Sequence, residues 1–490
     1  MRATTHSVLV VYDDSLAVPP DVAAVTGVQR FGDMLRRRER LSTTVRALSE
    51  QAGLTGMLHP RSAVDLAGVG DSARRYPEDM LYLLLPSNLA PTADRDDAVL
   101  FLRKLRYLTE PVGLSHGDDA TGAFLVDREG LLAYLAESEV ALGDPQRHLR
   151  DFAARVPPVE DALGLADLRV LGVTLEFLSG SFSARHFNQV AHDRYSVVKR
   201  SRDRDKIRRE HAFFGHLPEA MQPFFLQPYD YREDADGASY RTRRLFVPDL
   251  AVQWVHGAFS EAQFEQLLGH LFHFLDLRPR REVGRDAARE VATALYVDKV
   301  RERIERLLAL PEGRHADAVL RAGAVPDGIG GLLETYAAVY EQRSRRRRER
   351  ELAVSHGDLC FSNVLYSPST QTFQLIDPRG ADREEEIYSD AYYDVAKLSH
   401  SILGAYDFIV AGLFDLVHRD DLAISLRIDA PPSDALRTQF MLAVERHGFD
   451  LGLVRACEAS LFLSMLPLHA DAPKRLVAFA LRARDILAEL

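Results

Sequence analysis

The stretch SHGDLCFSN, residues 355–363, decides the fold of the C-terminal two-thirds of the chain, although its first four letters are not unique. The same letters stand at residues 115–118, in SHGDDATGA. The copies differ downstream: Asn363 is the fifth residue after Asp358, whereas Ala123 is the fifth residue after Asp118. We therefore expect the first copy to be a surface turn and the second to carry chemistry.

The residues after Asn363 predict a hairpin. In VLYSPSTQTFQLID (364–377), VLY and FQLI alternate around a turn at SPST, and the hairpin ends in Asp377. Mg²⁺ prefers oxygen ligands, typically one or two carboxylates with phosphate and water oxygens. A hairpin of this length can return Asp377 to the side of Asn363, with both oxygens toward one metal. Asp358 would then orient an acceptor hydroxyl and receive its proton, because phosphoryl transfer needs mainly positioning and charge neutralisation. The alternative is a buried Asp and Asn that cap loop backbone.

The run HGDLCFSNVL followed by LIDPRG resembles the catalytic and metal loops of the aminoglycoside phosphotransferase and choline kinase family, which shares the protein-kinase-like fold. The resemblance covers residues 165–490. It implies Asp358 as catalytic base, Asn363 and Asp377 as Mg²⁺ ligands, and ATP as phosphoryl donor. The DPRG sequence departs from the DFG of protein kinases. Pro378 fixes φ, which argues against kinase-style swinging of this loop.

Two upstream residues fit the same resemblance. Lys199 ends the apolar run YSVVK, where a phosphate-anchoring lysine is expected, and Glu210 follows in the predicted helix 205–218. A Lys–Glu pair would hold the lysine against the α- and β-phosphates. The alternatives are a surface lysine on an edge strand and a glutamate on a solvated helix face. Glu219 is the poorer partner because it lies beyond Pro218.

The nucleotide loop is less clear in the sequence. SGSFSAR (179–185) has one glycine, and we expect Ser179, Gly180 and Ser181 to bring backbone N–H groups to the phosphates. An ordinary hairpin turn is the alternative. FVPDLAVQW (246–254) lies where the adenine hinge should fall, without indicating which residues form it.

Other polar residues near these motifs are interpreted as structural or left open. Asp394, in YYDVAKLSHS, is expected to hold the catalytic loop. REEEIYSD (383–390) could bind a cationic acceptor or be a solvated loop. Cys360 is interpreted as a small packing residue. His270 and His273 have helical spacing without the glutamate of a zinc hydrolase, so we expect no metal there.

The pattern of strands and helices predicts three parts. Residues 1–155 alternate strands (7–12, 80–86, 123–127) with helices, including one over 97–108 and a helix-like stretch at 28–48, as in an α/β domain. VPPVED (156–161) marks the boundary. Residues 156–259 predict an antiparallel meander over 173–200, one helix and a strand pair at 239–255, as in a kinase N-lobe. Residues 260–490 predict a mainly helical C-lobe. The fold class is therefore α/β followed by a bilobal α+β phosphotransferase.

The first 155 residues carry no complete catalytic motif. VLVVYDDSLAVPP lacks the glycine-rich loop of a nucleotidyltransferase, and Asp13 lacks the Asp-x-Asp of a haloacid-dehalogenase phosphatase. Asp94-Arg95-Asp96 could serve as a glycosyltransferase metal motif, but it does not directly follow a strand. Some bacterial chains of surface-polysaccharide pathways join such a phosphotransferase to a sugar-nucleotide-handling domain, and the layout loosely resembles them. We expect a non-catalytic or degenerate domain.

Composition limits the remaining classes. The 490 residues carry a formal charge of −11, which argues against general nucleic-acid binding. Two cysteines give no disulfide framework. No apolar run predicts a transmembrane segment, and the N-terminus is a poor signal peptide, so we expect a cytoplasmic protein. RSRRRRER (343–350) is either a solvated helix face or a basic rim in which Arg345–Arg348 attracts anions or a membrane surface.

Together these observations predict an ATP- and Mg²⁺-dependent kinase that phosphorylates a hydroxyl of a small molecule, with a saccharide first among acceptors. Two alternatives stay open. One is a pseudokinase-like binding or scaffold protein, supported by the altered glycine loop and DPRG. The other is a bifunctional enzyme whose N-terminal domain acts on sugar nucleotides.

Overall fold

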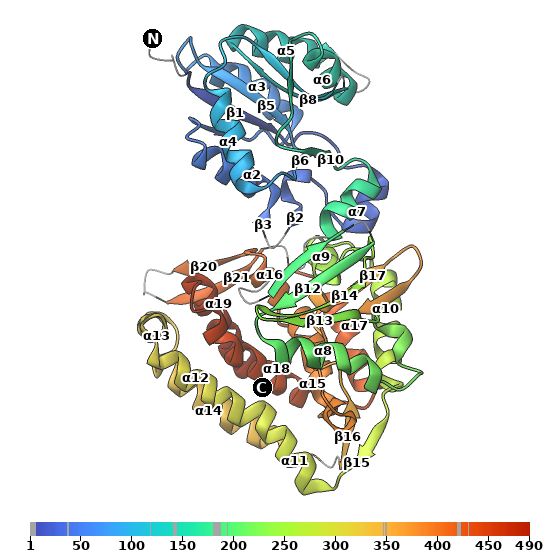
Figure 1. Ribbon diagram of the computed structural model, residues 1–490. Helices are drawn as coiled ribbons and strands as arrows, with labels where there is room; N and C mark the ends of the chain where they lie inside the picture. Colours follow the sequence, from blue (N-terminus) through green and yellow to red (C-terminus); the bar gives the residue numbers. More distant parts are fainter. Residues whose placement is uncertain are drawn as a thin grey trace. The chain divides into compact units, whose positions relative to one another are not determined.

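The computed structural model describes residues 6–36, 39–117, 119–140, 145–179, 188–193, 195–345, 347, 350–418, 423–429 and 431–490. The chain forms two compact units, Met1–Ser181 and Phe182–Leu490 (Figure 1). The division lies later than the predicted boundary at 155. The reason is that β9 (Pro158–Glu160) and β10 (Leu165–Asp167) pair with strands of the first unit.

The first unit is built on a six-stranded sheet with the order β4-β1-β5-β8-β7-β9. Strand β1 is parallel to β4 and β5, and β8 is antiparallel to both of its neighbours. Alternate residues of β1 enter different cores: Val8 and Val10 pack on one face, Leu9 and Val11 on the other. Burial on both faces explains the continuous apolar run of this strand. The strands are β1 (Val8–Asp13), β4 (Gly56–Leu58), β5 (Leu81–Pro86), β7 (Val112–His116) and β8 (Asp119–Val126).

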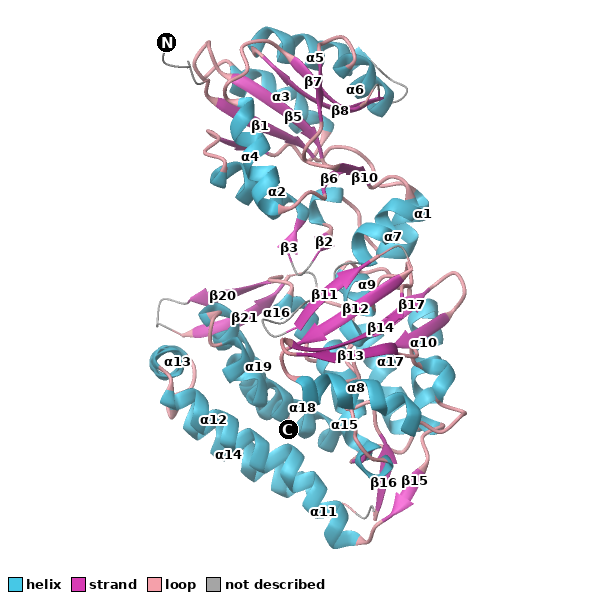
Figure 2. Ribbon diagram, in the orientation of Figure 1, coloured by secondary structure: helices cyan, strands magenta, loops and turns pink. Residues whose placement is uncertain are grey.

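Helices cover both faces of this sheet (Figure 2). They are α1 (Pro20–Thr26), α2 (Leu41–Gln51), α3 (Ala63–Ala73), α4 (Arg95–Leu105), α5 (Arg128–Val140), α6 (Pro145–Ala153) and α7 (Leu171–Ser179). Short elements complete the unit: η1 (Phe31–Asp33), the hairpin β2 (Leu35–Arg36) and β3 (Glu39–Arg40), and β6 (Leu89–Pro91), which pairs with β10. The predicted α/β layering is therefore present.

Two local predictions in this unit were wrong. The stretch 28–48 is helical only from Leu41, because η1 and the β2–β3 hairpin occupy its first part. Residues 171–179 form the helix α7 and not the start of a meander. Two apolar residues of the run VTLEFL, Phe177 and Leu178, are buried in the core of the first unit.

The second unit begins with a four-stranded antiparallel sheet, β11-β12-β14-β13, and one helix. The elements are β11 (Asn188–His192), β12 (Ser196–Ser201), α8 (Arg204–His216), β13 (Tyr229–Asp234) and β14 (Gly237–Arg243). Helix α8 is capped by Asp203, whose side chain accepts a hydrogen bond from the Lys206 N–H. It ends before Pro218, as predicted. The predicted strand pair at 239–255 was wrong in its second half, since Leu250–Val255 is the short helix α9 and the partner of β14 is β13.

Helices dominate the remainder of the second unit (Figure 2). They are α10 (Glu261–Asp276), α11 (Arg285–Thr293), a π-helical segment η3 (Ala294–Asp298), α12 (Lys299–Ala309), α13 (Pro311–Gly323), α14 (Gly328–Ser344), α15 (Ala391–Ile402), α16 (Tyr406–Val410), α17 (Asp434–Arg446), α18 (Leu451–Met465) and α19 (Pro473–Ala488). By length and composition, one helical segment of the described chain, Leu451–His469, could cross a bilayer, but 78% of its apolar window is buried inside the protein. It is the core helix of this lobe.

Short strands and single turns connect the helices and build the loops at the site. The small sheet β15-β16-β19 consists of Arg280–Glu282, Glu351–Val354 and Tyr388–Ser389, and the predicted hairpin is present as β17 (Val364–Ser367) and β18 (Thr372–Leu375). A second hairpin, β20 (Phe414–His418) and β21 (Ile424–Ile428), has no counterpart in the prediction. Single-turn elements are η2 (Gln222–Phe224), η4 (Phe361–Asn363), η5 (Glu384–Ile387) and η6 (Leu466–His469).

Candidate active site

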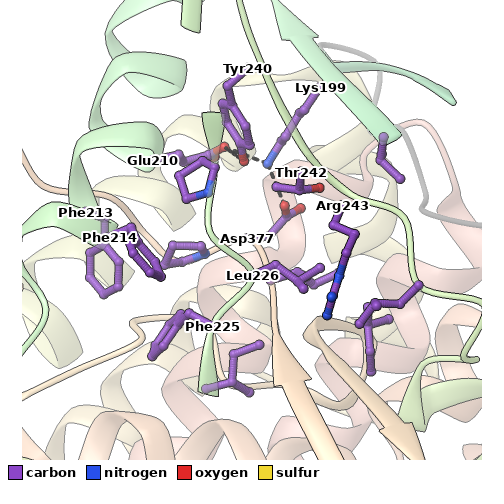
Figure 3. Close-up of a pocket in the computed structure, with 17 residues that line it drawn as sticks. Lys199, Glu210, Phe213, Phe214, Phe225, Leu226, Tyr240, Thr242, Arg243 and Asp377 are labelled. Atoms are coloured by element: carbon purple, nitrogen blue, oxygen red, sulfur yellow. Dashed lines mark hydrogen bonds and ion pairs between the residues drawn. The ribbon is translucent and has the colours of Figure 1, made fainter. Parts of the chain in front are cut away.

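Three of the predicted residues meet through Lys199. Its ammonium lies 2.7 Å from the carboxylate of Glu210 on α8 and 2.9 Å from that of Asp377 (Figure 3). Lys199 stands on β12 opposite Tyr240 of β14, whose hydroxyl donates to Glu210 at 3.1 Å. Residues 197 and 199 of the strand face the same cavity, because side chains alternate along a strand. The lysine is therefore neither on an edge strand nor at the surface.

The charges of this group are set by burial and by one another. Burial acts to lower the pKa of Lys199, but Asp377, Tyr240 and Glu210 outweigh it and raise that pKa well above its ordinary value. Burial raises the pKa of Glu210, Lys199 opposes that rise, and the charge of Asp377 adds to it. Lys199 thus stays a cation between two acids, as required of a group that holds phosphate oxygens.

Asp394 holds the loop around Asp358 that the sequence predicts to be catalytic. Its carboxylate accepts hydrogen bonds from the N–H groups of His356 and Gly357 and from the Ser355 hydroxyl, each at 3.0 Å. The fully buried carboxylate is also paired with Arg278 at 3.1 Å. Donors from three consecutive residues fix the backbone immediately before Asp358. The structural role expected for Asp394 fits this arrangement.

His356 joins the catalytic loop to the metal loop. Its Nε2 lies 3.0 Å from the Ile376 carbonyl, and its Nδ1 accepts the Asp358 N–H at 3.2 Å, so the hydrogen is on Nε2. Burial lowers the pKa of His356 despite the nearby acids, and the ring is neutral. The ring also stacks on Phe225 at 5.7 Å between centroids. A neutral histidine here serves as a spacer that sets the two loops at a fixed separation.

The β17–β18 hairpin returns Asp377 to Asn363, as the sequence predicts. Val364 pairs with Leu375, and the Ile376 N–H donates to the Asn363 carbonyl at 3.0 Å. Asp377 has a φ of +56°, an uncommon conformation for a residue with a side chain. Such strain is maintained where the surroundings determine the backbone, and it clusters at functional sites.

The oxygen atoms at the end of the hairpin suit a hard cation. The Asn363 amide nitrogen donates to the Asp358 carbonyl at 2.8 Å, which leaves its Oδ1 as an acceptor. Asp377 is half-exposed and contributes a carboxylate. No cluster of three or more His, Cys, Asp or Glu side chains suited to a metal occurs among the described residues. One amide and one carboxylate oxygen fit Mg²⁺ whose other ligands are phosphate and water oxygens.

Lys397 is a site residue that the sequence analysis missed. Its ammonium is 2.8 Å from the Asp358 carboxylate, and its side chain is 12% exposed against 29% for Asp358. Burial acts to lower the pKa of Lys397, but Asp358 and Tyr393 raise it above its ordinary value. Lys397 lies three residues after Asp394, so both point from one face of α15. The three-residue spacing from Asp394 is the sequence signal that could have identified Lys397 as a site residue.

A cavity of about 730 Å³, including its open mouth, lies beside Lys199. Its walls are mostly apolar and come from the sheet, from α8 and from the β17–β18 hairpin (Figure 3). Leu245, just after β14, lines it, and neither its backbone N–H nor its carbonyl has a partner among the described residues. The stretch 246–254, where the adenine hinge is expected, follows Leu245 directly, and its later part is helix α9. An apolar slot with a free peptide edge suits a flat heterocycle.

The segment after Asp377 docks on α8. Gly380 has a φ of +83°, and a Cβ there would lie 2.7 Å from the Arg209 carbonyl carbon and the Glu210 nitrogen. The Ala381 N–H donates to the Arg209 carbonyl at 3.0 Å, and Arg208 pairs with Asp382 at 3.0 Å. This contact fixes the helix that carries Glu210.

Other sequence predictions have separate outcomes. Of the nucleotide loop, Gly180, Ser181 and the Ser179 side chain lie outside the described residues. Cys360 is buried, and burial raises the pKa of its thiol to about 12, in keeping with a packing role. Glu219 is exposed, and the carboxylates that pair with Lys199 within the described residues are those of Glu210 and Asp377. His270 and His273 belong to no metal cluster in the part of the chain that the structure describes.

The charged stretches are largely used within the fold. In the acidic stretch 383–390, Glu386 pairs with Arg209 and Arg383, and Asp390 is buried. Asp390 pairs in turn with Arg347, one of the basic residues 343–350. Arg347 therefore does not contribute to an exposed basic rim, because its guanidinium is paired with Asp390 at the start of α15.

Polar residues of the first unit gather at the carboxyl ends of β1, β4 and β5, where ligands bind in many α/β sheets. Several of them contact one another, but the buried hydroxyl of Tyr12 at the end of β1 has no hydrogen-bond partner among the described residues. Buried Asp14 accepts from the Gly32 N–H at 2.9 Å and lies 3.2 Å from His59. Asp94 of the Asp-x-Asp motif caps α4 by accepting the Asp96 N–H at 3.1 Å. The motif thus has a structural use.

The chain matches no family model and no curated protein. Among solved structures it is similar to a glucosamine kinase bound to glucosamine, ADP and inorganic phosphate, at 13% identity over 62% of this chain and 76% of that one, with a TM-score of 0.38. It is also similar to an aminoglycoside phosphotransferase bound to AMP-PNP and hygromycin B, at 13% identity over 64% of this chain and 97% of that one, with a TM-score of 0.35. A third similar structure is an aminoglycoside phosphotransferase from Streptomyces rimosus, at 17% identity over 60% of this chain and 97% of that one, with a TM-score of 0.33.

Proposed function

We propose that the second unit is an ATP- and Mg²⁺-dependent phosphotransferase that phosphorylates a hydroxyl of a small molecule, with a saccharide as the first candidate. The observation that supports this most directly is the convergence of Lys199 on Glu210 and Asp377 beside an apolar cavity. The catalytic loop and the metal loop are joined by His356 at the same place.

Each residue has a role in the proposed reaction. Lys199, held by Glu210, would bind the α- and β-phosphates, and Leu245 would meet the base. Asn363 and Asp377 would hold Mg²⁺, which when bound neutralises charge on the phosphates. Asp358 would accept the hydrogen bond and the proton of the acceptor hydroxyl. Lys397 would hold the Asp358 carboxylate and keep it ionised.

Substitution of Asp358 by Asn tests the proposal. Phosphoryl transfer from Mg-ATP should fall by at least about a hundredfold, because general-base catalysis contributes about 10²- to 10⁴-fold. Mg-ATP affinity and the Tm should stay close to those of the unchanged protein. Full transfer activity in Asp358→Asn would reject the assignment of the base.

The scaffold alternative makes a different prediction. A pseudokinase-like binder should fail to turn over ATP with acceptors of every charge class, and Asp358→Asn should change none of its binding properties. The chemistry of the group argues against it, since the lysine, its glutamate, the proposed base and both proposed metal ligands are present together. For the first unit we propose no second activity.

A further inference from the structure

Cationic side chains crowd around the catalytic carboxylate. Lys397 pairs with Asp358, and the ammonium of Lys299 on α12 lies 3.3 Å from the Tyr393 hydroxyl. Both ammonium groups lie near the same Tyr393 ring, at 5.5 Å for Lys299 and 6.0 Å for Lys397 from its centroid. The shared ring places Lys299 next to the ion pair of the base.

Two arginines extend this cluster. Arg303 follows Lys299 by one helical turn on α12, and its guanidinium donates to the Ser464 carbonyl at 2.8 Å. The stem of Arg379 crosses Gly357, the residue before Asp358: a Cβ on Gly357 would lie 2.6 Å from the Arg379 Cβ. Arg379 is exposed, whereas Lys299 and Arg303 are half-buried, so all three can reach a ligand from solvent.

Neighbouring acids do not compensate these three charges. Within the described residues, no carboxylate lies within ion-pair distance of Lys299, Arg303 or Arg379. Glu302, the acid next to Arg303 in sequence, pairs with Arg306 at 2.6 Å. Asp407 lies close to Cys360 but is only 4% exposed, so it presents little charge to solvent. In a chain of net charge −11, three neighbouring cations with no carboxylate within ion-pair distance among the described residues are a local departure from the overall charge.

The titration behaviour agrees with a strongly positive field. Burial lowers the pKa of Lys299, and Arg379, Arg303 and Lys397 lower it further while Tyr393 opposes them. Burial by itself would raise the pKa of Tyr393, yet Lys397, Lys299 and Arg379 bring it below the ordinary value. An environment that favours a phenolate also favours other anions.

The backbone just before Lys299 is also unusual. The segment Ala294–Asp298 is π-helical, and Lys299 begins the α-helix that follows it. Within the π-segment, Tyr296 is buried and its hydroxyl donates to Asp390 at 3.1 Å. A π-turn inserts a residue and shifts the helix face, and such turns are frequent at functional sites. Here the π-turn directly precedes a lysine that contacts Tyr393 of α15.

We propose that Lys299, Arg303 and Arg379 bind an anionic group, phosphate or carboxylate, on the acceptor whose hydroxyl Asp358 activates. This inference rests on the proposed function and specifies its substrate class. A cationic acceptor is disfavoured because it would face three uncompensated cations, and the acidic stretch 383–390 that could have received it has Glu386 and Asp390 already paired with arginines. Guanidinium and ammonium groups together suit the several oxygens of such an anion.

Binding of inorganic phosphate is the first test. The full chain, with Mg²⁺ and AMP-PNP in the nucleotide site, is titrated with phosphate by calorimetry. We expect one phosphate site, weakened at least about tenfold in Lys299→Met and in Arg303→Met, since hydrogen bonds between ionised groups are about twice as strong as neutral ones. Arg301→Met, an exposed arginine on the same helix, is the matched control and should bind normally. Absent phosphate binding, or equal binding by all variants, overturns the proposal.

Acceptor selectivity is the second test. ATP consumption is measured with glucose, glucose 6-phosphate, glucuronate and glucosamine, and with a neutral, a phosphorylated and a cationic amino alcohol. We expect kcat/KM to be at least about tenfold higher for the anionic member of an accepted series, and Lys299→Met to remove that preference mainly through KM. Glucose 6-phosphate and glucuronate separate a phosphate from a carboxylate preference. Preference for glucosamine or the cationic amino alcohol overturns the proposal.

The two proposals fail differently. Asp358-dependent ATP consumption with neutral or cationic acceptors, unaffected by Lys299→Met, would remove the anionic acceptor and leave the phosphotransferase intact. Failure to bind Mg-ATP at all would remove the phosphotransferase itself. Phosphate binding that depends on Lys299 in that case would still identify an anion site beside Asp358.

Discussion

Lys397 and Asp358 form an ion pair of 2.8 Å at the centre of the catalytic loop. Three residues earlier on the same helix, Asp394 holds the backbone N–H groups of His356 and Gly357. Helix α15 therefore fixes Asp358 at two places: the backbone before it through a carboxylate and its side chain through an ammonium. Under the proposed function, α15 would position the catalytic base although none of its residues belongs to the HGD or DPRG motifs.

Removal of the Lys397 charge should slow catalysis more than it weakens nucleotide binding. In Lys397→Met we expect kcat to fall about tenfold to a thousandfold, because the base loses its orientation, with little change in the KM for ATP. Lys397→Arg should recover part of the rate. Lys104→Met, an exposed lysine of the first unit, is the control. An unchanged kcat in Lys397→Met would show that the pair does not position Asp358.

Loss of Glu210, the partner of Lys199, should weaken nucleotide binding. In Glu210→Gln the buried Lys199 keeps only Asp377 as a charged partner at short range, so we expect the Kd for Mg-ATP to rise by about tenfold or more. Equilibrium titration with a fluorescent ATP analogue measures it. Glu219→Gln removes an exposed acid just beyond the same helix and should leave the Kd unchanged. Equal affinity of both variants would contradict the role of the pair.

Gly380 should be intolerant of any side chain. With a φ of +83° and α8 backbone 2.7 Å from the added carbon, Gly380→Ala must move α8 or the DPRG loop. We expect a loss of about 1–3 kcal/mol in the free energy of unfolding together with weaker Mg-ATP binding. Gly215→Ala, within α8 and with open space around it, should raise stability by up to about 1 kcal/mol. Thermal unfolding measures the stability, and titration with Mg-ATP measures the affinity. A Gly380→Ala variant with the stability and Mg-ATP affinity of the unchanged protein would contradict close packing of the DPRG loop on α8.

The catalytic hairpin was predictable because its signals are local. Alternating VLY and FQLI around SPST fix the β17–β18 register, and that register places Asp377 beside Asn363 without knowledge of the remaining fold. Glu210 could likewise be placed by spacing alone, since α8 has a clear stop at Pro218. These predictions needed only strand and helix periods.

The parts that were missed depend on contacts distant in sequence. Helix α7 looks β-rich in VTLEFL, yet Phe177 and Leu178 are drawn into the core of the first unit, and tertiary packing overrides propensity. In the sequence, Lys397 resembles an ordinary lysine on a helix surface. Its role becomes visible from the tertiary contact between α15 and the loop that carries Asp358. Lys299 meets Tyr393 only because α12 packs near α15, and no sequence pattern reports a contact across nearly a hundred residues.

His400 on α15 provides a pH-dependent test of the packing beneath the site. It is fully buried between Tyr406 and Phe462, and neither ring nitrogen has a hydrogen-bond partner among the described residues. Burial, reinforced by Lys397, lowers the pKa of His400 well below its ordinary value. The unfolded chain takes up a proton as the pH falls through about 6.5, while the folded protein does not. Stability is therefore fully present above that pH and is lost below it, by about 1.4 kcal/mol per pH unit for this group.

His400→Phe removes the titrating ring and keeps an aromatic side chain in the stack. We expect the free energy of unfolding at neutral pH to be retained or raised, because no buried polar nitrogen is left unpaired. Its decline between about pH 6.5 and about pH 5 should become shallower by the contribution of one histidine. Urea unfolding followed by Trp254, the single tryptophan of the chain, reports on the second unit alone. His356 also titrates with a lowered pKa and is present in both proteins, so the difference between the two slopes isolates His400. Identical slopes would mean that His400 is protonated in the folded state or is reached by water.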